Sequence, residues 1–493
     1  MRRTRLLVLG LAVVLLAPAP GALADHKKFV VDDDLAQCPN AAYTTITAAV
    51  AAAPPGSTVL VCEGTYEEHV VIATSAKNAL QVKAKGKPEQ VVLDGLNTMM
   101  HGFELGGTTP GTDVSGVLIE GFHVTRYHDD IWVHPNADGN TLRKNMTTLA
   151  WDHDGIVVQG DRNLVERNVS FGQTQPIGCG ISVGTGGSFN VVRDNETFNN
   201  PNTGILLGGG LLGPAGPGNR IVHNHSHDNG KPLVGILGGN GITNAISPGT
   251  LIAHNFAHDN NRHGILVTGA LSTGVGVERN KVVHNGSTNE DDGIRLADGA
   301  AGNVVAHNDS RLNRHDGIHL TRTATGTAGA NNNVVEHNKL FDNGTPGAGN
   351  GCGIDIDGGS ANNIVGNNWI ARHDRAGIRL RNAGTGNVVR QNETREAPSP
   401  GDGILLINAS GNIVERNHSV ANGRDGIRIE PTSSGNTILR NHARRNGAFD
   451  CHDLTTGPGT AGTANFWIEN QGETQMPPGI CEPEEDDEDD HDD

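Results

Sequence analysis

The stretch Gly293-Ile-Arg-Leu-Ala-Asp-Gly-Ala-Ala-Gly-Asn-Val-Val-Ala-His-Asn308 contains both halves of a phrase that recurs along most of the chain. One half is a Gly-Ile pair followed by alternating residues, and the other is a short apolar run closed by Asn. The Gly-Ile pair begins at positions 155, 180, 204, 235, 264, 293, 317, 353, 377, 403 and 426. The closing Asn recurs at intervals of 23 to 31 residues, at Asn145, Asn168, Asn195, Asn224, Asn255, Asn280, Asn308, Asn338, Asn368, Asn392, Asn417 and Asn441.

The length of the repeat selects the architecture. A period between about 20 and 50 residues indicates a solenoid, a propeller or an array. Each repeat holds short strands with period-2 alternation and lacks the helical periodicity of leucine-rich or ankyrin repeats. A propeller blade needs four strands in about 40 residues, which these intervals do not accommodate. The sequence therefore predicts an all-β parallel β-helix of about twelve coils.

The recurring Asn has a physical reason. Neighbouring coils of such a solenoid lie about 4.8 Å apart, so stacked Asn amides can form hydrogen bonds along its axis. Asn also tolerates the left-handed backbone that sharp bends require. Triplets such as Asn168-Val-Ser and Asn308-Asp-Ser also match the glycosylation acceptor pattern, but most of them contain a repeat Asn whose side chain we expect inside.

These repeats resemble the right-handed parallel β-helix superfamily of pectate lyases and, among its relatives, the periplasmic NosD-type proteins with PbH1 repeats. The segment from Tyr43 to Glu68 is similar to the superfamily's N-terminal cap, in which a short helix leads into the first coil. Ala464 to Asn470 and Pro477 to Cys481 are similar to its C-terminal closing segment. The resemblance covers roughly residues 30 to 481 and implies three strands per coil, of which the Gly-Ile strand lines the usual binding cleft.

Composition and charge exclude several classes of protein. The 493 residues include 68 Gly and only 3% aromatic residues, which is too few for large aromatic cores. The formal net charge of -18 argues against a nucleic-acid partner, because phosphate binding needs a basic face. After residue 24, no apolar run approaches the roughly 18 residues of a membrane-spanning helix.

The two termini suggest an exported protein. Residues 1–24 have a basic start, an apolar stretch and a small-residue cleavage site, as in a secretory signal peptide. Residues 482–493 contain ten acidic residues and are expected to be disordered. Between them we expect one β-helix domain over 25–481, with an N-terminal cap over 30–75, coils over about 76–445 and a C-terminal cap over 446–481.

The six cysteines divide into two groups. Cys38 with Cys62, and Cys451 with Cys481, are close enough in sequence for disulfides, each contributing on the order of 3 to 4 kcal/mol in an oxidising compartment. Cys179 and Cys352 occupy the same place in the repeat but are seven coils apart, about 34 Å, which no disulfide can span. We expect both to be free and buried.

A block of charge lies on the outward side of the Gly-Ile strands. In Gly-Ile-x-Leu-x both x residues point outward, which places five candidate catalytic residues on three consecutive coils and the candidate substrate-binding residue Arg295 one coil below. Acids can protonate a glycosidic oxygen or hold a cation, and Arg can neutralise a uronate or abstract a proton. The insertions 323–332 and 344–351 would wall a cleft there. The five residues are His319, Asp355, Asp357, Arg379 and Arg381.

Other interpretations of these residues stay open. The acids and Arg could form only a surface ion-pair ladder. Trp132 and His134, with Glu104, could form a sugar-stacking platform, or Trp132 could simply cover the end of the solenoid. His223, His254, His307 and His337 could form an outward column that binds copper or zinc, although Arg279 interrupts it.

Two functions from different classes follow. The leading hypothesis is a secreted, monomeric protein, extracellular or periplasmic, that binds and potentially cleaves an acidic extracellular polysaccharide by lyase or hydrolase chemistry. In an eliminative mechanism Arg379 or Arg381 would be the base, and Asp355 and Asp357 would position Ca²⁺ or the uronate. The alternative is a non-catalytic cell-envelope or surface protein with an adhesive or NosD-like metal-associated role.

Overall fold

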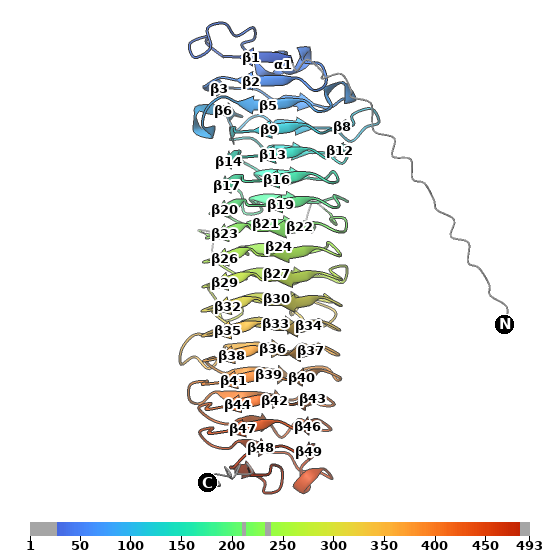
Figure 1. Cartoon of the computed structure of the whole chain (residues 1–493), viewed down its shortest axis with the longest axis vertical. Helices are drawn as coiled ribbons and strands as arrows, with labels where there is room; N and C mark the ends of the chain where they lie inside the picture. The colour runs from blue at the N-terminus through green and yellow to red at the C-terminus, as the bar shows by residue number, and fades with distance from the viewer. Residues whose placement is uncertain (1–26, 210–212, 232–237, 484–493) are drawn as a thin grey trace, which may run out of the picture.

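The computed structural model describes residues 27–209, 213–231 and 238–483, which wind into one long solenoid (Figure 1). The first strand lies at one end of the long axis and the last strands lie at the other (Figure 1). The expected signal peptide, residues 1–24, lies outside the described residues, as does most of the acidic tail, residues 484–493.

Three parallel sheets form the wall, and successive coils each add a strand to them. Sheet A consists of β1 (Lys28–Val31), β2 (Thr58–Val61), β5 (Gln81–Ala84), β9 (Leu118–Glu120), β13 (Thr141–Arg143), β16 (Leu164–Glu166), β19 (Val191–Arg193), β22 (Arg220–Val222), β25 (Leu251–Ala253), β28 (Gly276–Glu278), β31 (Val304–Ala306), β34 (Val334–Glu336), β37 (Ile364–Gly366), β40 (Val388–Arg390), β43 (Ile413–Glu415), β46 (Thr437–Leu439) and β49 (Phe466–Ile468). Sheet B consists of β3 (Gly64–Tyr66), β6 (Val91–Asp94), β10 (His123–Thr125), β14 (Met146–Thr148), β17 (Val169–Phe171), β20 (Glu196–Phe198), β23 (His225–His227), β26 (Phe256–His258), β29 (Lys281–Val283), β32 (Asp309–Arg311), β35 (Lys339–Phe341), β38 (Trp369–Ala371), β41 (Glu393–Arg395), β44 (His418–Val420) and β47 (His442–Arg444).

Sheet C contains the Gly-Ile strands. It consists of β4 (Val70–Ile72), β7 (His101–Leu105), β11 (Asp129–Val133), β15 (Ile156–Val158), β18 (Ile181–Val183), β21 (Ile205–Leu207), β24 (Ile242–Asn244), β27 (Ile265–Thr268), β30 (Ile294–Ala297), β33 (Ile318–Thr321), β36 (Cys352–Ile356), β39 (Ala376–Arg381), β42 (Asp402–Ile407), β45 (Ile427–Ile429), β48 (Cys451–Asp453) and β50 (Gln475–Met476). A two-stranded sheet joins β8 (Val114–Ser115) to β12 (Ala137–Asp138). Short 3-10 turns lie at Ser75–Lys77, Pro88–Gln90 and Thr460–Gly462.

The solenoid is longer than the repeat count predicted. Sheet A has 17 strands within the described residues, so there are about 17 coils and the expected number of twelve was wrong. The Asn phrase starts only at Asn145, whereas β1, β2, β5 and β9 precede it. The first coils turn without Asn; Gly121, with φ of +88°, makes the turn after β9. Strands of the three sheets also occur inside both expected cap segments, 30–75 and 446–481.

One Gly-Ile pair was assigned to the wrong place. The pair that begins at position 235 lies outside the described residues, and the sheet C strand of that coil is β24, directly after Gly241. The two Gly-Ile pairs are only six residues apart in sequence. Period alone could not distinguish between them.

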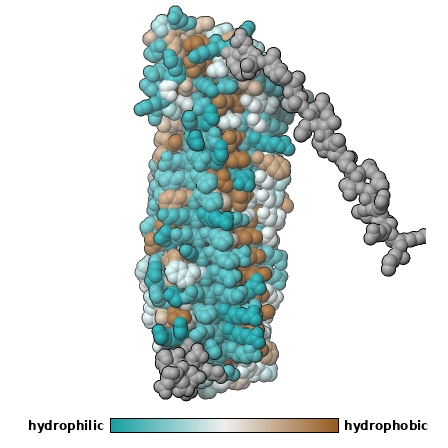
Figure 2. Space-filling model, viewed as in Figure 1, coloured by the Kyte–Doolittle hydropathy of each residue, from teal (hydrophilic) through white to brown (hydrophobic). Residues whose placement is uncertain are grey.

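Stacked aliphatic side chains fill the solenoid. Val305, Val335 and Val365 lie in register on adjacent coils and are 0% exposed. Each buried side chain of this size contributes on the order of 1.5–3 kcal/mol relative to exposure. Since the strands are parallel throughout, the fold is the expected all-β, right-handed parallel β-helix. The face shown in Figure 2 is largely hydrophilic, with a narrow hydrophobic band along the axis.

Buried amides form ladders at the corners. The twelve repeat Asn, from Asn145 to Asn441, lie in one file between sheets A and B. In this file, Asn308 Nδ2 donates to Asn338 Oδ1 at 3.0 Å, and Asn338 Nδ2 donates to Asn368 Oδ1 at 3.0 Å. The first Asn of the phrase builds a second file, in which Asn333 donates to Asn363. A third file after sheet B contains Asn285 and Asn313.

The left-handed backbone belongs to the residue before each repeat Asn, not to the Asn. His307 and His337 have φ of +59° and +56°, and Arg416 has φ of +52°. This corrects the expectation that the Asn takes the left-handed conformation. The Asn side chain is needed inside, whereas the preceding side chain faces outward, so the strained position can hold His, Arg or Lys.

Caps close both ends. Helix α1 (Ile46–Ala52) begins at Thr45, whose hydroxyl accepts from Ala48 N, and it buries Ile46 and Val50. Disulfides join Cys38 to Cys62 and Cys451 to Cys481, and Cys179 and Cys352 are free and buried. Within the described ranges, no helix has the length and apolarity needed to cross a membrane.

Candidate functional site

Sheet C presents the expected charged strip on its outer face. The strand register pairs Arg295 with His319, His319 with Asp355, and Asp355 with Arg379, on β30, β33, β36 and β39. The alternate residues, such as Ile354 and Ile356, are 0% exposed and fill the interior. Alternation along each strand therefore places the four polar side chains in one outward column.

The acids of this strip are paired. Arg379 Nε and Nη2 donate to the two carboxylate oxygens of Asp355 at 2.9 and 2.7 Å. Arg381 Nη2 donates to Asp357 Oδ2 at 2.8 Å, and the Thr321 hydroxyl donates to the other oxygen of Asp357. Ca²⁺ coordination by Asp355 would require breaking a buried two-point ion pair. The strip is thus closed at Asp355 and Arg379, which are 0% and 5% exposed.

His319 lies among carboxylates on both sides of its ring. Its Nδ1 donates to Asp292 Oδ2 at 3.0 Å, and its Nε2 lies 3.2 Å from Asp357 Oδ1. Burial opposes a charge on the ring, but Asp292 and Asp357 outweigh it and raise the pKa of His319 to about 10. The pKa of Asp357 is held well below its usual range despite burial, because His319 and Arg381 stabilise its anion. His319 is therefore a cation at neutral pH and cannot serve as a general base there.

Three residues that were not among the predicted site residues lie beneath the strip. Asp292 and Asp316 are 0% exposed, and His315 lies between them, with Nδ1 donating to Asp292 Oδ1 at 2.8 Å. A signal existed, because Asp directly before Gly-Ile recurs at positions 154, 292, 316, 402 and 425. These Asp side chains accept backbone N–H groups of the next coil, as Asp316 Oδ1 does from Cys352 N at 2.6 Å.

A groove lies over the strip, between the corners that flank sheet C. A cavity of about 660 Å³ is joined to one of about 790 Å³, because Arg322, Asp357 and Arg381 line both. The insertion that starts at Thr323 walls the groove, and Asp298 fixes its start, with Thr323 N at 2.8 Å from Asp298 Oδ1. Charged residues lining the first cavity are Arg262, Arg295, Arg322, Arg381, His315, His319, Glu290, Asp298 and Asp357.

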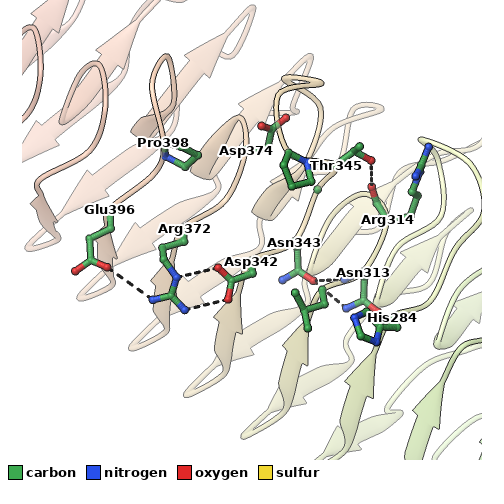
Figure 3. A pocket seen from close by; sticks show the side chains of 13 residues that line it. His284, Asn313, Arg314, Asp342, Asn343, Thr345, Arg372, Asp374, Glu396 and Pro398 are labelled. Carbon is green, nitrogen blue, oxygen red and sulfur yellow. Dashed lines mark hydrogen bonds and ion pairs between the residues drawn. The ribbon is translucent and has the colours of Figure 1, made fainter.

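The other insertion borders a different cavity. Gly344, Thr345 and Pro346 line a space of about 600 Å³ at the corner between sheets B and C, so they do not wall the strip as expected (Figure 3). Arg372 bridges Asp342 and Glu396 in this cavity, with Nε at 2.8 Å from Asp342 Oδ1 (Figure 3). The guanidinium of Arg372 in this cavity is therefore already paired with carboxylates.

The structure does not bring Trp132 and His134 near the groove. Trp132 lies in β11 and His134 directly after it, six coils before β30, a distance of about 29 Å along the axis. His134 Nε2 lies 2.9 Å from Glu104 Oε1, and the Trp132 ring is 5.0 Å from the His101 ring. These residues form a separate aromatic and histidine cluster at the N-terminal end.

The expected histidine column exists only as two pairs. His223 stacks on His254 at 4.9 Å and His307 stacks on His337 at 5.1 Å between ring centroids. The coil of Arg279 separates the pairs. Stacked rings alone do not supply the convergent nitrogens of a metal centre.

Two comparisons with known proteins found matches. The family described as "Periplasmic copper-binding protein (NosD)" matches residues 326–477, and no curated protein matches the chain. Similar solved structures include a PL6 alginate lyase complex with trisaccharide (12% identity, 82% of each chain covered, TM-score 0.47). Others are the Dettilon tailspike protein (14% identity, TM-score 0.42) and pectate lyase Pel9A (17% identity, TM-score 0.35). The alignments cover 84% and 69% of this chain and 62% and 73% of those proteins.

Residues 326–477 do not fit a copper centre. Within this segment, all of which the structure describes, no three His, Cys, Asp or Glu side chains bring donor atoms to one point. Asp355 and Asp357 meet only His319, which lies outside the segment, and both are paired with Arg.

Proposed function

We propose that the chain binds an acidic polysaccharide in the groove over β30, β33, β36 and β39. The observation that carries this proposal is Arg322, which is exposed at the junction of the two cavities and has no ion-pair partner among the described residues. Its neighbour Arg381 lines both cavities and has a 40% exposed side chain. Guanidinium groups donate two parallel hydrogen bonds to a carboxylate, which suits a uronate.

The shape of the groove supports an extended ligand. The two joined cavities together exceed the space that one sugar ring needs, and they cross sheet C from one corner toward the other. Arg295 lies in the floor, with its Nη1 donating to Glu290 O at 2.9 Å and its Nε without a partner. A polymer with a carboxylate on each ring would meet several cations along this path.

The same contacts favour binding over cleavage. Arg379, the first candidate base, is buried and paired with Asp355, and the His319 ring is 4% exposed between Asp292 and Asp357. Arg381 is accessible but cationic, and abstraction of a proton would require it to lose that charge. Signal-peptide-like residues 1–24 and the two disulfides support an extracellular or periplasmic location for the protein.

The test is titration calorimetry with defined oligomers of alginate and pectate, and with a neutral oligosaccharide. We expect acidic oligomers to bind with an affinity that falls as salt rises, and Arg322→Ala and Arg381→Ala each to weaken binding about tenfold or more. Arg372→Ala removes an exposed Arg from the other cavity and serves as the matched control.

Equal binding of neutral sugar, or equal losses in Arg372→Ala and Arg322→Ala, would count against the groove. The same oligomers are also followed for unsaturated products and reducing ends. If the wild-type chain forms such products and Asp355→Asn does not, the groove is catalytic and the proposal of binding without cleavage is wrong.

A further inference from the structure

Four side chains converge in a buried space below the groove floor. Asp292 precedes β30, His315 and Asp316 precede β33, and His319 lies in β33. Asp292 and Asp316 are 0% exposed, and His315 and His319 are 8% and 4% exposed. We call these four residues the tetrad; it consists of two carboxylates and two imidazoles with hardly any access to water.

One donor atom from each residue of the tetrad can be chosen so that all four atoms lie within 4.8 Å of one another. His315 Nδ1 lies 2.8 Å from Asp292 Oδ1 and 3.0 Å from Asp316 Oδ2. His319 Nδ1 lies 3.0 Å from Asp292 Oδ2 and 3.7 Å from Asp316 Oδ2. Tetrahedral Zn²⁺ with bonds of about 2.0–2.1 Å separates its ligand atoms by about 3.3 Å, which falls inside this range.

The ring hydrogens of the two histidines do not supply a donor for every carboxylate oxygen of the tetrad. Each ring has a single Nδ1 hydrogen, and both are directed to Asp292. Asp316 Oδ2 is buried, and the nitrogens that face it are His315 Nδ1 at 3.0 Å, whose one hydrogen is directed to Asp292, and His319 Nδ1 at 3.7 Å. A buried carboxylate oxygen without a donor is costly, and a cation at the centre would satisfy it.

We propose that the tetrad is a structural site for a divalent transition metal, with Zn²⁺ as the ion that it fits. Both rings would bind through Nδ1 as neutral imidazoles, each carboxylate would supply one oxygen, and no position would be left for a substrate. Imidazole with carboxylate suits Zn²⁺, whereas Ca²⁺ requires six to eight oxygen ligands.

Neighbouring contacts already hold the ligands in place. Asp316 Oδ1 accepts from Cys352 N at 2.6 Å, which turns Oδ2 toward the rings. The Asp292 N–H donates to His263 Nδ1 at 2.9 Å. Such outer contacts are the usual means of orienting metal ligands. His319 would keep its proton on Nε2, the atom that faces Asp357 in the groove floor, so metal binding would fix the floor of the groove. The inference does not depend on the proposed ligand of the groove.

The experiment uses the full chain, freed of metal with a chelator, desalted, and then titrated with Zn²⁺ alone. Retained zinc is measured by elemental analysis, and Co²⁺ is substituted to report geometry from its visible absorption. We expect one equivalent of zinc, the intense absorption of tetrahedral Co²⁺, and a large excess of Ca²⁺ that does not displace either ion.

Variants locate the ion. Asp316→Asn keeps the shape of the side chain and the acceptor for Cys352 N, and His315→Gln removes one ring. Both should lose the bound zinc while far-UV circular dichroism and the melting transition show that the solenoid is folded. His227→Gln is the control, because Glu196, His225 and His227 form another, more exposed donor group and should not be required.

Zinc that is retained by both tetrad variants, or that is lost in His227→Gln, would overturn the assignment. The assignment would also be overturned if the wild-type chain retained no zinc once the unbound zinc had been removed after the titration. A Co²⁺ spectrum of octahedral type would also contradict it, since the tetrad offers four ligands.

Discussion

Each ladder Asn satisfies several buried groups at once. Asn338 Oδ1 accepts from both the backbone N and the Nδ2 of Asn308, and its own Nδ2 donates to Val305 O. A shorter, longer or charged side chain cannot reproduce this arrangement at 1% exposure. The residue before it has the left-handed backbone but needs no particular side chain. The period of the repeat therefore predicted the Asn file. The left-handed backbone was expected at the Asn itself and lies at the residue before it.

Asn338→Ala should destabilise the protein strongly. It removes the acceptor that Asn308 N and Nδ2 share and the side-chain donor to Val305 O, at about 1–3 kcal/mol for each buried group left unpaired. The urea midpoint of unfolding measures the loss. Asn40→Ala, at an exposed residue, is the control and should change stability little. Equal midpoints for the two variants would show that the ladder contributes nothing.

Stability should also fall in mildly alkaline solution because of His153. The carboxylate of Asp154, 3.4 Å from His153 Nδ1, and the nearby carboxylate of Asp129 raise the pKa of His153 to about 9, and burial opposes them only in part. The nearby ring of His128 is stacked on it at 6.2 Å. A raised folded pKa gives stability that is complete below about pH 6.5 and is lost as pH rises through about 9.

The expected loss is up to about 3 kcal/mol, since each pKa unit corresponds to about 1.4 kcal/mol. Urea unfolding from pH 6 to 10 measures it, and His153→Gln should flatten that part of the profile. A variant whose profile matches the wild type would assign the loss to other groups.

Among the elements, neighbouring sheet C strands hold one another through charge as well as through backbone pairing. The outward column runs from Arg295 to Arg379 and continues into Leu405, which is 0% exposed. Alternation along the strands sufficed to predict this column from the sequence. It could not predict the corner insertions, because the direction of a loop depends on its corner: residues 323–332 follow sheet C, and residues 344–351 precede it.

Replacing one partner of the Asp355–Arg379 pair should lower the free energy of unfolding more than replacing both partners. Arg379→Leu leaves a carboxylate buried without its partner, for which we expect a loss of about 3–5 kcal/mol. The double variant Asp355→Leu, Arg379→Leu extends the apolar column begun by Leu405 and should recover most of that loss. A double variant as unstable as the single one, in the same denaturation experiment, would contradict this explanation.

The wall of the groove should depend on Asp298. Its carboxylate accepts from Thr323 N and from the Thr323 hydroxyl at 2.8 and 2.9 Å. Asp298→Ala should increase hydrogen exchange in residues 322–330 and weaken binding of acidic oligomers, with little change in global stability. Exchange is compared with Asp342→Ala, which alters the other cavity. Unchanged exchange at 322–330 would show that the insertion is held by other contacts.

At the scale of the whole molecule, coils contact mainly the coils next to them. Stability is then close to a sum of coil and interface contributions, and unfolding can begin at an end. The repeat made the fold class predictable from sequence alone. The number of coils was underestimated because the N-terminal coils lack the repeat Asn and because the last coil, whose Asn470 continues the file after Asn441, had been assigned to the cap. The tetrad was missed because its residues come from the Gly-Ile halves of two adjacent repeats and meet only after the coils stack.

Removal of the C-terminal disulfide should loosen one end only. The Cys451–Cys481 bond closes a loop with a sequence separation of 30 residues, for which loop closure alone gives about 3.6 kcal/mol. In Cys451→Ser, Cys481→Ser, hydrogen exchange should rise around β48, β49 and β50 and remain unchanged at β30 to β39. Uniform exchange along the chain would mean that the coils unfold together.

The constant register of the three sheets has a consequence for how such a protein can change. Residues 364–387 amount to a single turn between equivalent Asn positions. A tandem copy of these 24 codons would add one coil of about 4.8 Å to the solenoid. The coils on either side would pair with the new coil in the register in which they now pair with each other. Because this turn contains β39, its copy would lengthen the groove, whereas gain or loss of whole turns outside β30 to β39 would alter only the distance of the groove from the ends.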